Sequence, residues 1–221
     1  MPERAQELAK LFPAHVVVET GVPGELPGDL LAEEAACVER AVKKRRDEFA
    51  AGRLLARRAL ERLDQPTTPL LPAEDRSPIW PSGIVGTISH TRGLCAVALA
   101  RSSASRCLGL DIEDGSPLKD ELVERIATPR ELEWIRSSAT SAAERGRLGK
   151  LIFSAKEAFY KCQYPLTKRF LEFEDVELSL DLEARTFTAK VRPDKAKLPS
   201  ELRLDARFLL LDDFVVCAVS G

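Results

Sequence analysis

Two carboxylates, Asp111 and Glu113, end the apolar segment "LGLDIE", and together they could bind a cation. In a strand, residues two apart project from the same face, so these two acids would lie side by side. Like charges held this close are unfavourable unless something positive lies between them. Mg²⁺ suits such an oxygen-only site, with few protein ligands and a phosphate-bearing substrate. A strand that ends in solvent with both acids hydrated explains the same pair, so the pair alone leaves both interpretations open.

A third carboxylate, Glu157, lies between Lys156 and Lys161 in the segment "FSAKEAFYK". Helical spacing places it on one polar stripe with the residues Lys150, Ser154 and Lys161. The opposite face is apolar and carries Leu148, Ile152, Ala155, Phe159 and Cys162. By itself this pattern favours a solvated stripe with a Glu157–Lys161 pair, which contributes roughly 0.2–0.5 kcal/mol.

A basic helix is predicted earlier in the chain, in "KKRRDEFAAGRLLARRALERL". Its spacing places Arg46, Arg53 and Arg57 on one face, and the planar arginine fork suits phosphate. Gly52 would let another backbone or a ligand come close. A solvated face, balanced by the acids of the same helix, is an equally good interpretation of this segment.

The segment "GTISHTRG" places Ser89 and His90 at the end of an apolar strand. His90 could donate to a phosphate or act as a base, or it could be a histidine beside a turn with no role. A Ser89–His90 nucleophilic pair is not expected, because adjacent strand residues point to opposite faces. Before this strand, residues 64–83 hold five prolines, and long irregular segments of this kind are often functional.

Composition limits the classes of function. The chain has 221 residues, of which 44% are hydrophobic, enough for one large domain or two small ones. The net charge of -2 argues against general nucleic-acid binding. Five cysteines without a metal-binding spacing favour reduced, mostly buried thiols. Neither a signal peptide nor a membrane span is predicted, so a cytoplasmic protein is expected.

The pattern of elements predicts an α+β protein with two halves, residues 1–108 and 109–221. Each half should contain helices and an antiparallel strand set, with a ligand cleft between the halves. "TPRELEWI" has the signature of a helix start, with Thr128 as N-cap and Glu131 three residues later. The expected strands are "HVVVET", "IVGTISH", "LCAVALA", "CLGLDIE", "DVELSLD", "RTFTAKV", "LRLDARFLLL" and "FVVCAVS". The second and third of these should form a hairpin around "HTRG", and the last two, which flank Asp212 and Asp213, should form a C-terminal hairpin.

These motifs, in this order, resemble the 4'-phosphopantetheinyl transferases, in the siderophore-synthetase-associated branch typified by the enterobactin synthetase component. The resemblance spans about residues 45–176. "FSAKEAFYK" fits the family pattern W/F-[ST]-x-K-E-[SA]-x-x-K at every position, and "LGLDIE" fits G-[IV]-D-x-E except that Leu110 replaces the β-branched residue. The resemblance implies a pseudo-twofold pair of α+β halves with the active site between them.

The family transfers the phosphopantetheine arm of coenzyme A to a serine of an apo acyl, peptidyl or aryl carrier protein, releasing adenosine 3',5'-bisphosphate. Carried over, the metal ligands for Mg²⁺ (or Mn²⁺) are Asp111, Glu113 and Glu157. The catalytic residues are Glu157 as a base, or Glu113 or Glu157 through a held water, and Lys161 on the pyrophosphate. The other coenzyme A contacts are Arg46, Arg53, Arg76, Ser89, His90 and Lys156.

Two other functions fit parts of the same pattern. A non-catalytic module for coenzyme A or nucleotides would need the basic helix but no acidic triad. A Mg²⁺-dependent phosphohydrolase would use the same acids, with water in place of the carrier serine. The resemblance favours the transferase, acting as a monomer without nucleic acid or a membrane span.

Overall fold

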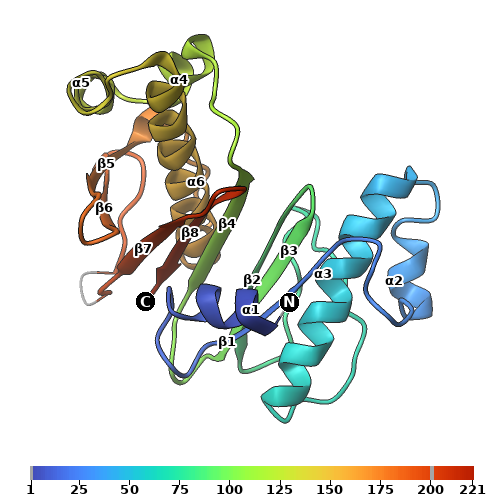
Figure 1. Cartoon of the computed structure of the whole chain (residues 1–221). Coiled ribbons are helices and arrows are strands. Elements are labelled where there is room, and N and C mark those ends of the chain that lie inside the picture. Colours follow the sequence, from blue (N-terminus) through green and yellow to red (C-terminus); the bar gives the residue numbers. More distant parts are fainter. Residues whose placement is uncertain (1, 200–201) are drawn as a thin grey trace. The chain divides into compact units, whose positions relative to one another are not determined.

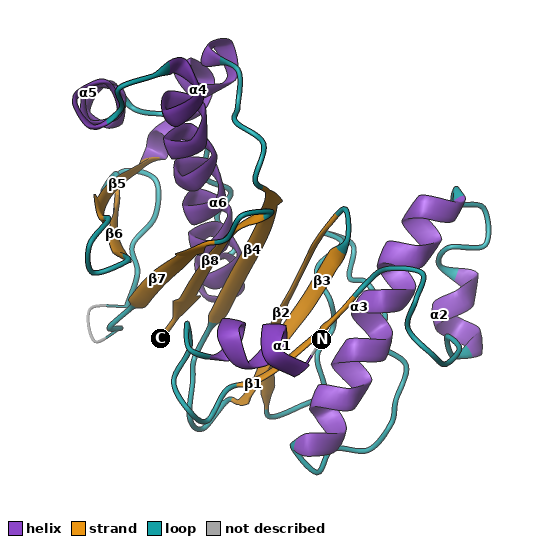
Figure 2. Ribbon diagram, viewed as in Figure 1, coloured by secondary structure: helices purple, strands orange, loops and turns teal. Residues whose placement is uncertain are grey.

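The chain divides into two compact units, Met1–Leu108 and Gly109–Gly221. The structure, a computed structural model, describes residues 2–199 and 202–221. Each unit combines helices with one sheet, which confirms the predicted α+β class (Figures 1 and 2). No helix within those described ranges is long and apolar enough to cross a membrane.

The first unit is a three-stranded antiparallel sheet in the order β1-β3-β2, with one long helix on it. Its elements are α1 (Pro2–Ala9), β1 (Val17–Gly21), α2 (Ala32–Ala36), α3 (Lys43–Arg62), β2 (Ile84–Thr91) and β3 (Leu94–Arg101). The predicted hairpin is β2–β3, in which Thr91 pairs with Leu94. Gly93 has a φ of 88°, a left-handed conformation that such tight turns favour in glycine. A buried cluster that includes Leu55, Ala59 and Val97 fixes α3 on the sheet.

The second unit is a five-stranded sheet in the order β4-β8-β7-β6-β5 with α6 packed on it. Its elements are β4 (Leu108–Asp114), α4 (Asp120–Ile126), α5 (Pro129–Ser138), α6 (Ala142–Thr167), the 3-10 turn η1 (Phe173–Asp175), β5 (Val176–Asp181), β6 (Thr186–Val191), β7 (Asp205–Leu210) and β8 (Phe214–Ser220). The predicted C-terminal hairpin is confirmed by the antiparallel β7–β8 register.

The start of α5 has the capping box that the sequence predicts. The Thr128 hydroxyl accepts from the Glu131 N–H, and the Glu131 carboxylate accepts from the Thr128 N–H at 2.6 Å. Two N–H groups that a helix start leaves unpaired are therefore satisfied reciprocally. Unlike most capping residues, Glu131 is only 1% exposed, so its charge needs an internal partner.

Candidate active site

A glycine lets the strand that carries the acids approach the helix that carries the lysines. A Cβ atom built on Gly109 would lie 1.9 Å from the Ala158 carbonyl oxygen and 2.9 Å from the Cys162 nitrogen. Real Cβ atoms do not come this close to backbone, so β4 reaches α6 here only because residue 109 has no side chain. The contact places the acidic end of β4 along α6.

Asp111 and Lys161 form the closest ion pair of this contact. The Lys161 Nζ donates to Asp111 Oδ1 at 2.7 Å and to the Leu110 carbonyl oxygen at 3.0 Å. The Asp111 side chain is 7% exposed, so the pair has little water to screen it. Ser154, one turn earlier than Glu157 on α6, donates from its hydroxyl to the Asp111 carbonyl oxygen at 3.4 Å. The helix therefore holds both the backbone and the carboxylate of residue 111.

Glu157 lies beside this pair, and its environment disfavours the ionised carboxylate. Burial raises the pKa of Glu157, the negative charge of Asp111 raises it further, and Lys161 opposes both. A carboxylate with a raised pKa holds a proton more readily, which is the property of a group that accepts one during a reaction.

Glu113 faces another lysine, Lys150, to which the sequence assigned no role. The Lys150 Nζ lies 3.5 Å from Glu113 Oε2 and 3.4 Å from Asp114 Oδ1, and its side chain is 6% exposed. Burial and then Asp111 raise the pKa of Glu113, while Lys150 lowers it. Each acid of the D-x-E pair thus has its own lysine from α6.

The solvated-stripe interpretation of α6 is wrong. Lys150 and Ser154 are buried, at 5% and 0% exposure, and Glu157 and Lys161 are half-buried. The apolar face is buried as well, so the helix is covered on both sides. Helical periodicity predicts that a polar stripe faces water. It cannot show that such a stripe packs against carboxylates of another element.

The structure does not bring the amine of Lys156 to these carboxylates. Its Nζ donates to Glu131 Oε2 at 2.7 Å, to the Phe173 carbonyl oxygen at 2.7 Å and to the Ile126 carbonyl oxygen at 3.0 Å. These three bonds use all three N–H donors of an ammonium group. The expectation of a phosphate-binding Lys156 therefore has no support in this geometry.

The carboxylates of this site are of the residue types that bind Mg²⁺. Among residues 2–199 and 202–221, no three side chains of His, Cys, Asp or Glu gather closely enough to hold a metal ion. Mg²⁺ does not require such a cage, because it keeps several waters and binds through one or two carboxylates plus substrate phosphates. Asp111 and Glu113, two apart on β4, are a donor pair of that kind. The residue types fit this metal.

A cavity of about 250 Å³ opens beside Glu157 in the second unit. Its other walls are mainly aromatic and aliphatic: Tyr160, Phe170, Leu171, Phe173 and Val176. Tyr160 contacts Tyr164 and Phe170 through ring pairs at 5.4 and 5.7 Å between centroids, which shapes the wall. Lys156 and Glu172 also line the cavity. A mostly apolar cavity next to the Glu157 carboxylate suits the apolar part of a substrate beside a proton acceptor.

In the first unit, α3 approaches β2 at Gly52, where an added Cβ would lie 3.1 Å from Ile88 Cγ2. This packing places the start of α3 next to His90. Arg45 Nη1 lies 3.5 Å from His90 Nε2, and Glu48 Oε2 lies 3.8 Å from His90 Nδ1. The sequence included Arg45 in a run of four bases but could not single it out, because its proximity to His90 depends on helix–sheet packing.

Two of the arginines assigned to the basic face, Arg53 and Arg57, bond to other residues of the first unit. Arg53 is 8% exposed, donates from Nε to the Leu70 carbonyl oxygen at 3.0 Å, and lies 3.8 Å above the Phe49 ring. Burial lowers the pKa of Arg53, and Glu34 opposes this shift. Arg57 pairs with the buried Glu34 at 2.7 Å. Arg53 therefore helps to hold the proline-rich segment on α3, and Arg57 joins α3 to Glu34, whose carboxylate accepts from the Leu70 N–H at 2.9 Å.

The remaining predicted coenzyme A contacts differ in exposure. Arg46, on the first turns of α3, and Arg76, in the proline-rich segment, are exposed. Arg76 has a φ of 66°, a left-handed conformation that is uncommon for residues other than glycine. Ser89 is 5% exposed, whereas the adjacent His90 side chain is 29% exposed, as expected for opposite faces of β2.

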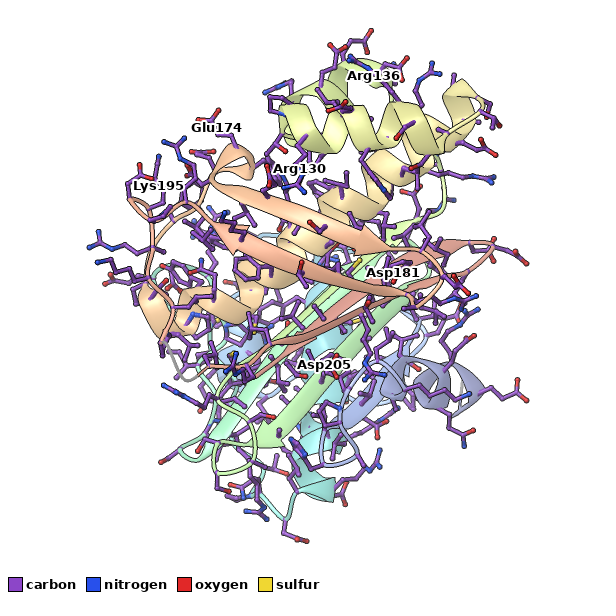
Figure 3. The ribbon with its side chains drawn as sticks, turned by 90° about the vertical axis from the view of Figure 1, so that its left-hand side faces the viewer. Arg130, Arg136, Glu174, Asp181, Lys195 and Asp205 are labelled. Atoms are coloured by element: carbon purple, nitrogen blue, oxygen red, sulfur yellow. The ribbon has the colours of Figure 1, made fainter. Side chains whose placement is uncertain are left out.

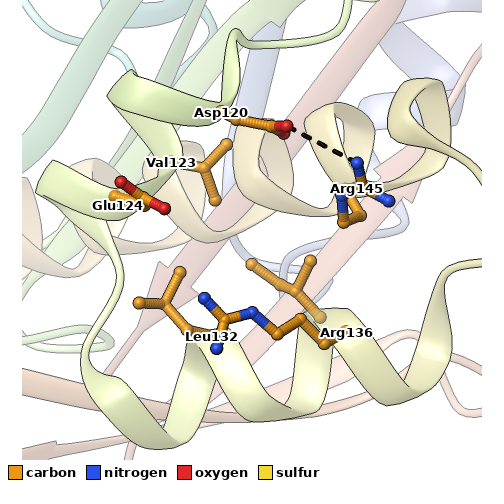
Figure 4. A pocket seen from close by; sticks show the side chains of 7 residues that line it. Asp120, Val123, Glu124, Leu132, Arg136 and Arg145 are labelled. Carbon is orange, nitrogen blue, oxygen red and sulfur yellow. Dashed lines mark hydrogen bonds and ion pairs between the residues drawn. The ribbon is translucent and has the colours of Figure 1, made fainter.

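Other charged groups of the second unit lie outside this site. A cavity of about 320 Å³ lies among α4, α5 and the start of α6 and is lined partly by Val123. Figure 4 shows the pair that Asp120 of α4 forms there with Arg145 of α6, whose charged atoms are 3.5 Å apart. Figure 3 labels charged residues of this unit such as Arg130 and Glu174, which are exposed. The buried lysines of α6 therefore differ from these surface charges in being shielded from water.

Comparison with known proteins identifies the class. A family model described as "4'-phosphopantetheinyl transferase superfamily" matches residues 107–219, and the model of the "4'-phosphopantetheinyl transferase N-terminal domain" matches residues 33–100. The chain belongs to the 4'-phosphopantetheinyl transferase superfamily. It is an enzyme of this class, which transfers phosphopantetheine to carrier proteins.

Its relatives agree with this assignment. The chain is 42% identical over 189 residues to the 4'-phosphopantetheinyl transferase Svp of Streptomyces mobaraensis, covering 83% of this chain and 76% of that protein. It is 32% identical over 215 residues to the transferase Npt of Nocardia iowensis, covering 92% and 95%. It is also 32% identical over 142 residues to enterobactin synthase component D of Escherichia coli (strain K12), covering 63% and 65%.

Proposed function

We propose that this enzyme transfers the 4'-phosphopantetheine arm of coenzyme A to a serine of an apo acyl, peptidyl or aryl carrier protein, with Mg²⁺, and releases adenosine 3',5'-bisphosphate. The observation that carries the proposal is the half-buried group of Asp111, Glu157 and Lys161, in which two acids and one cation meet where β4 crosses α6. Phosphoryl transfer needs positioning and charge neutralisation above all, and this group provides both.

These residues can account for each bond and proton that changes in the reaction. The serine Oγ attacks the phosphorus that carries the arm, a new O–P bond forms, and the bond from that phosphorus to the bisphosphate oxygen breaks. Glu157 accepts the serine proton, for which its raised pKa suits it. The Lys161 ammonium, 2.7 Å from Asp111, stabilises the negative charge that the leaving phosphate gains.

Mg²⁺ would be held by Asp111 and Glu113, with Glu157 beside them, and when bound it neutralises charge on the pyrophosphate. The apolar cavity beside Glu157 would take the pantetheine arm, whose gem-dimethyl and methylene groups suit walls such as Tyr160 and Phe173. In the first unit, Arg46, Arg76, His90 and the newly recognised Arg45 would contact the phosphates of the nucleotide.

The test uses purified enzyme, coenzyme A, Mg²⁺ and a panel of apo acyl, peptidyl and aryl carrier proteins, read by intact mass. We expect at least one carrier to gain the mass of one phosphopantetheine group, and no gain in EDTA. Asp111→Asn and Glu157→Gln should each reduce the rate by about 10²-fold or more, because each removes a charge at the reacting centre.

Controls separate this reaction from the other two functions. Arg130→Gln, an exposed substitution on α5, should keep the wild-type rate. Cleavage of coenzyme A at full rate without a carrier would support the hydrolase instead. Binding of coenzyme A without mass gain on any carrier, with or without Mg²⁺, would support the non-catalytic module and overturn the proposal.

A further inference from the structure

Lys156 belongs to the "KE" of the segment "FSAKEAFYK", yet its amine points to a network away from Asp111. Its side chain is 2% exposed, and that of its partner Glu131 is 1% exposed. Burying an ion pair this completely has a desolvation cost in free energy. The attraction between the two charges offsets that cost only if both groups are fully hydrogen-bonded. The network around Lys156 and Glu131 meets that condition.

The bonds of this pair join five segments of the second unit. Lys156 on α6 bonds the end of α4 through the Ile126 oxygen and η1 through the Phe173 oxygen. Glu131 on α5 accepts from the Leu178 N–H of β5 at 2.7 Å through Oε1, and from Thr128 N–H and Lys156 through Oε2. One buried pair therefore fixes the relative positions of α4, α5, α6, η1 and β5.

Three of these segments, α6, η1 and β5, also line the cavity beside Glu157. Lys156, Phe173 and Val176 line that cavity together with Glu157. The Phe173 ring also contacts Phe153 of α6, with 5.6 Å between ring centroids. A displacement of η1 would therefore change the cavity next to the proton-accepting carboxylate, although Lys156 itself touches no reacting atom.

We propose that Lys156 is a positioning residue: its buried ion pair with Glu131 holds η1 and the start of β5 against α6, and thereby sets the cavity wall beside Glu157. This inference rests on the proposed transfer reaction. It replaces the expectation that Lys156 binds a phosphate of coenzyme A, because its three donors already have internal acceptors.

The experiment is a double-mutant cycle of Lys156→Met, Glu131→Gln and the two combined. For each protein, kcat and KM for the carrier, the Kd for coenzyme A and the melting temperature are measured, with rates expressed per folded molecule. Lys156→Met should lower kcat by about tenfold or more, and because the cavity is proposed to hold the pantetheine arm, any rise in the Kd for coenzyme A should be matched by Glu131→Gln. The double variant should recover about tenfold in kcat over Lys156→Met, because it no longer buries an unpaired carboxylate.

A conservative variant covers the case in which Lys156→Met does not fold. Lys156→Arg keeps the positive charge but changes the donor geometry, so a positioning role predicts a kcat loss of about tenfold. A phosphate contact predicts that Lys156→Arg retains coenzyme A affinity and rate. The matched control is Lys161→Met, whose loss of rate Glu131→Gln should not rescue, because Lys161 pairs with Asp111 instead.

Three results would overturn the proposal. The first is a Kd for coenzyme A raised more than about tenfold by Lys156→Met but not by Glu131→Gln, the result for a phosphate contact. The second is a wild-type kcat in folded Lys156→Met, the result for a purely structural pair. The third is no recovery in the double variant. Failure of the wild-type enzyme on every carrier would instead refute the proposed function, so the two failures are distinguishable.

Discussion

Gly109→Ala tests whether the close approach of β4 to α6 builds the active site. The added Cβ would lie 1.9 Å from the Ala158 carbonyl oxygen, a backbone atom that has no rotamer to change. Restoring an ordinary contact requires the strand and the helix to separate by about 1 Å or more, a strain of about 1–3 kcal/mol. The same shift would lengthen the 2.7 Å bond between Lys161 and Asp111 beyond hydrogen-bonding distance.

A 1 Å misplacement at a reacting centre can reduce the rate by about 10²-fold. We therefore expect Gly109→Ala to lower kcat by about that factor, measured by intact-mass transfer to an apo carrier, and to lower the melting temperature. The matched control is Gly149→Ala on α6, whose Cβ would have three side-chain atoms of Val123 as its nearest neighbours, the closest at 2.4 Å. If Gly109→Ala kept more than half of the wild-type kcat, or if both variants lost rate equally at equal stability, the argument would be refuted.

Three further outcomes follow from the same structure. Glu157→Gln should melt at a higher temperature than wild type at pH 7, because burial and Asp111 disfavour the ionised carboxylate in the folded state. A raised folded pKa penalises folding above the unfolded pKa, so this gain should vanish toward about pH 4, and calorimetry across that range checks the sign. A thiol reagent at pH 7 should react rapidly with Cys37 alone of the five cysteines, since the other four are buried and burial raises the pKa of Cys95 to about 12; two or more fast thiols would contradict this. Thr128→Ala should cost about 1 kcal/mol by removing the N-cap of α5, which denaturant unfolding measures, and a Thr128→Ser variant should retain most of that stability.

Short-range sequence patterns predicted several elements of the fold. The capping box at Thr128 and Glu131 and the two-residue turn at Gly93 depend on neighbours within four residues, so the sequence predicted both α5 and the β2–β3 hairpin. The β7–β8 hairpin was likewise predicted, from two strand-like segments that flank Asp212 and Asp213. These features form through short-range hydrogen bonds and alternating burial, which are visible in a linear pattern.

The assignment of partners was a different matter. Helical spacing taken alone favoured a Glu157–Lys161 pair, whereas Lys161 bonds Asp111, fifty residues away in the chain. It placed Lys156 with the phosphate-binding cations, whereas that amine pairs with Glu131. It gave no role to Lys150, which faces Glu113. Each of these partners lies on another element, and no periodicity within one helix could identify it.

Motifs and periodicity are local properties of the chain. They therefore predicted the family, the residue types of the site and the elements that carry them. The three-dimensional packing was needed to show that Lys150 and Lys161 meet carboxylates of β4, whereas Lys156 pairs with Glu131 of α5. The physical reason is the contact at Gly109: the absence of one side chain lets β4 reach α6, and charges that a helical wheel assigns to water become internal partners.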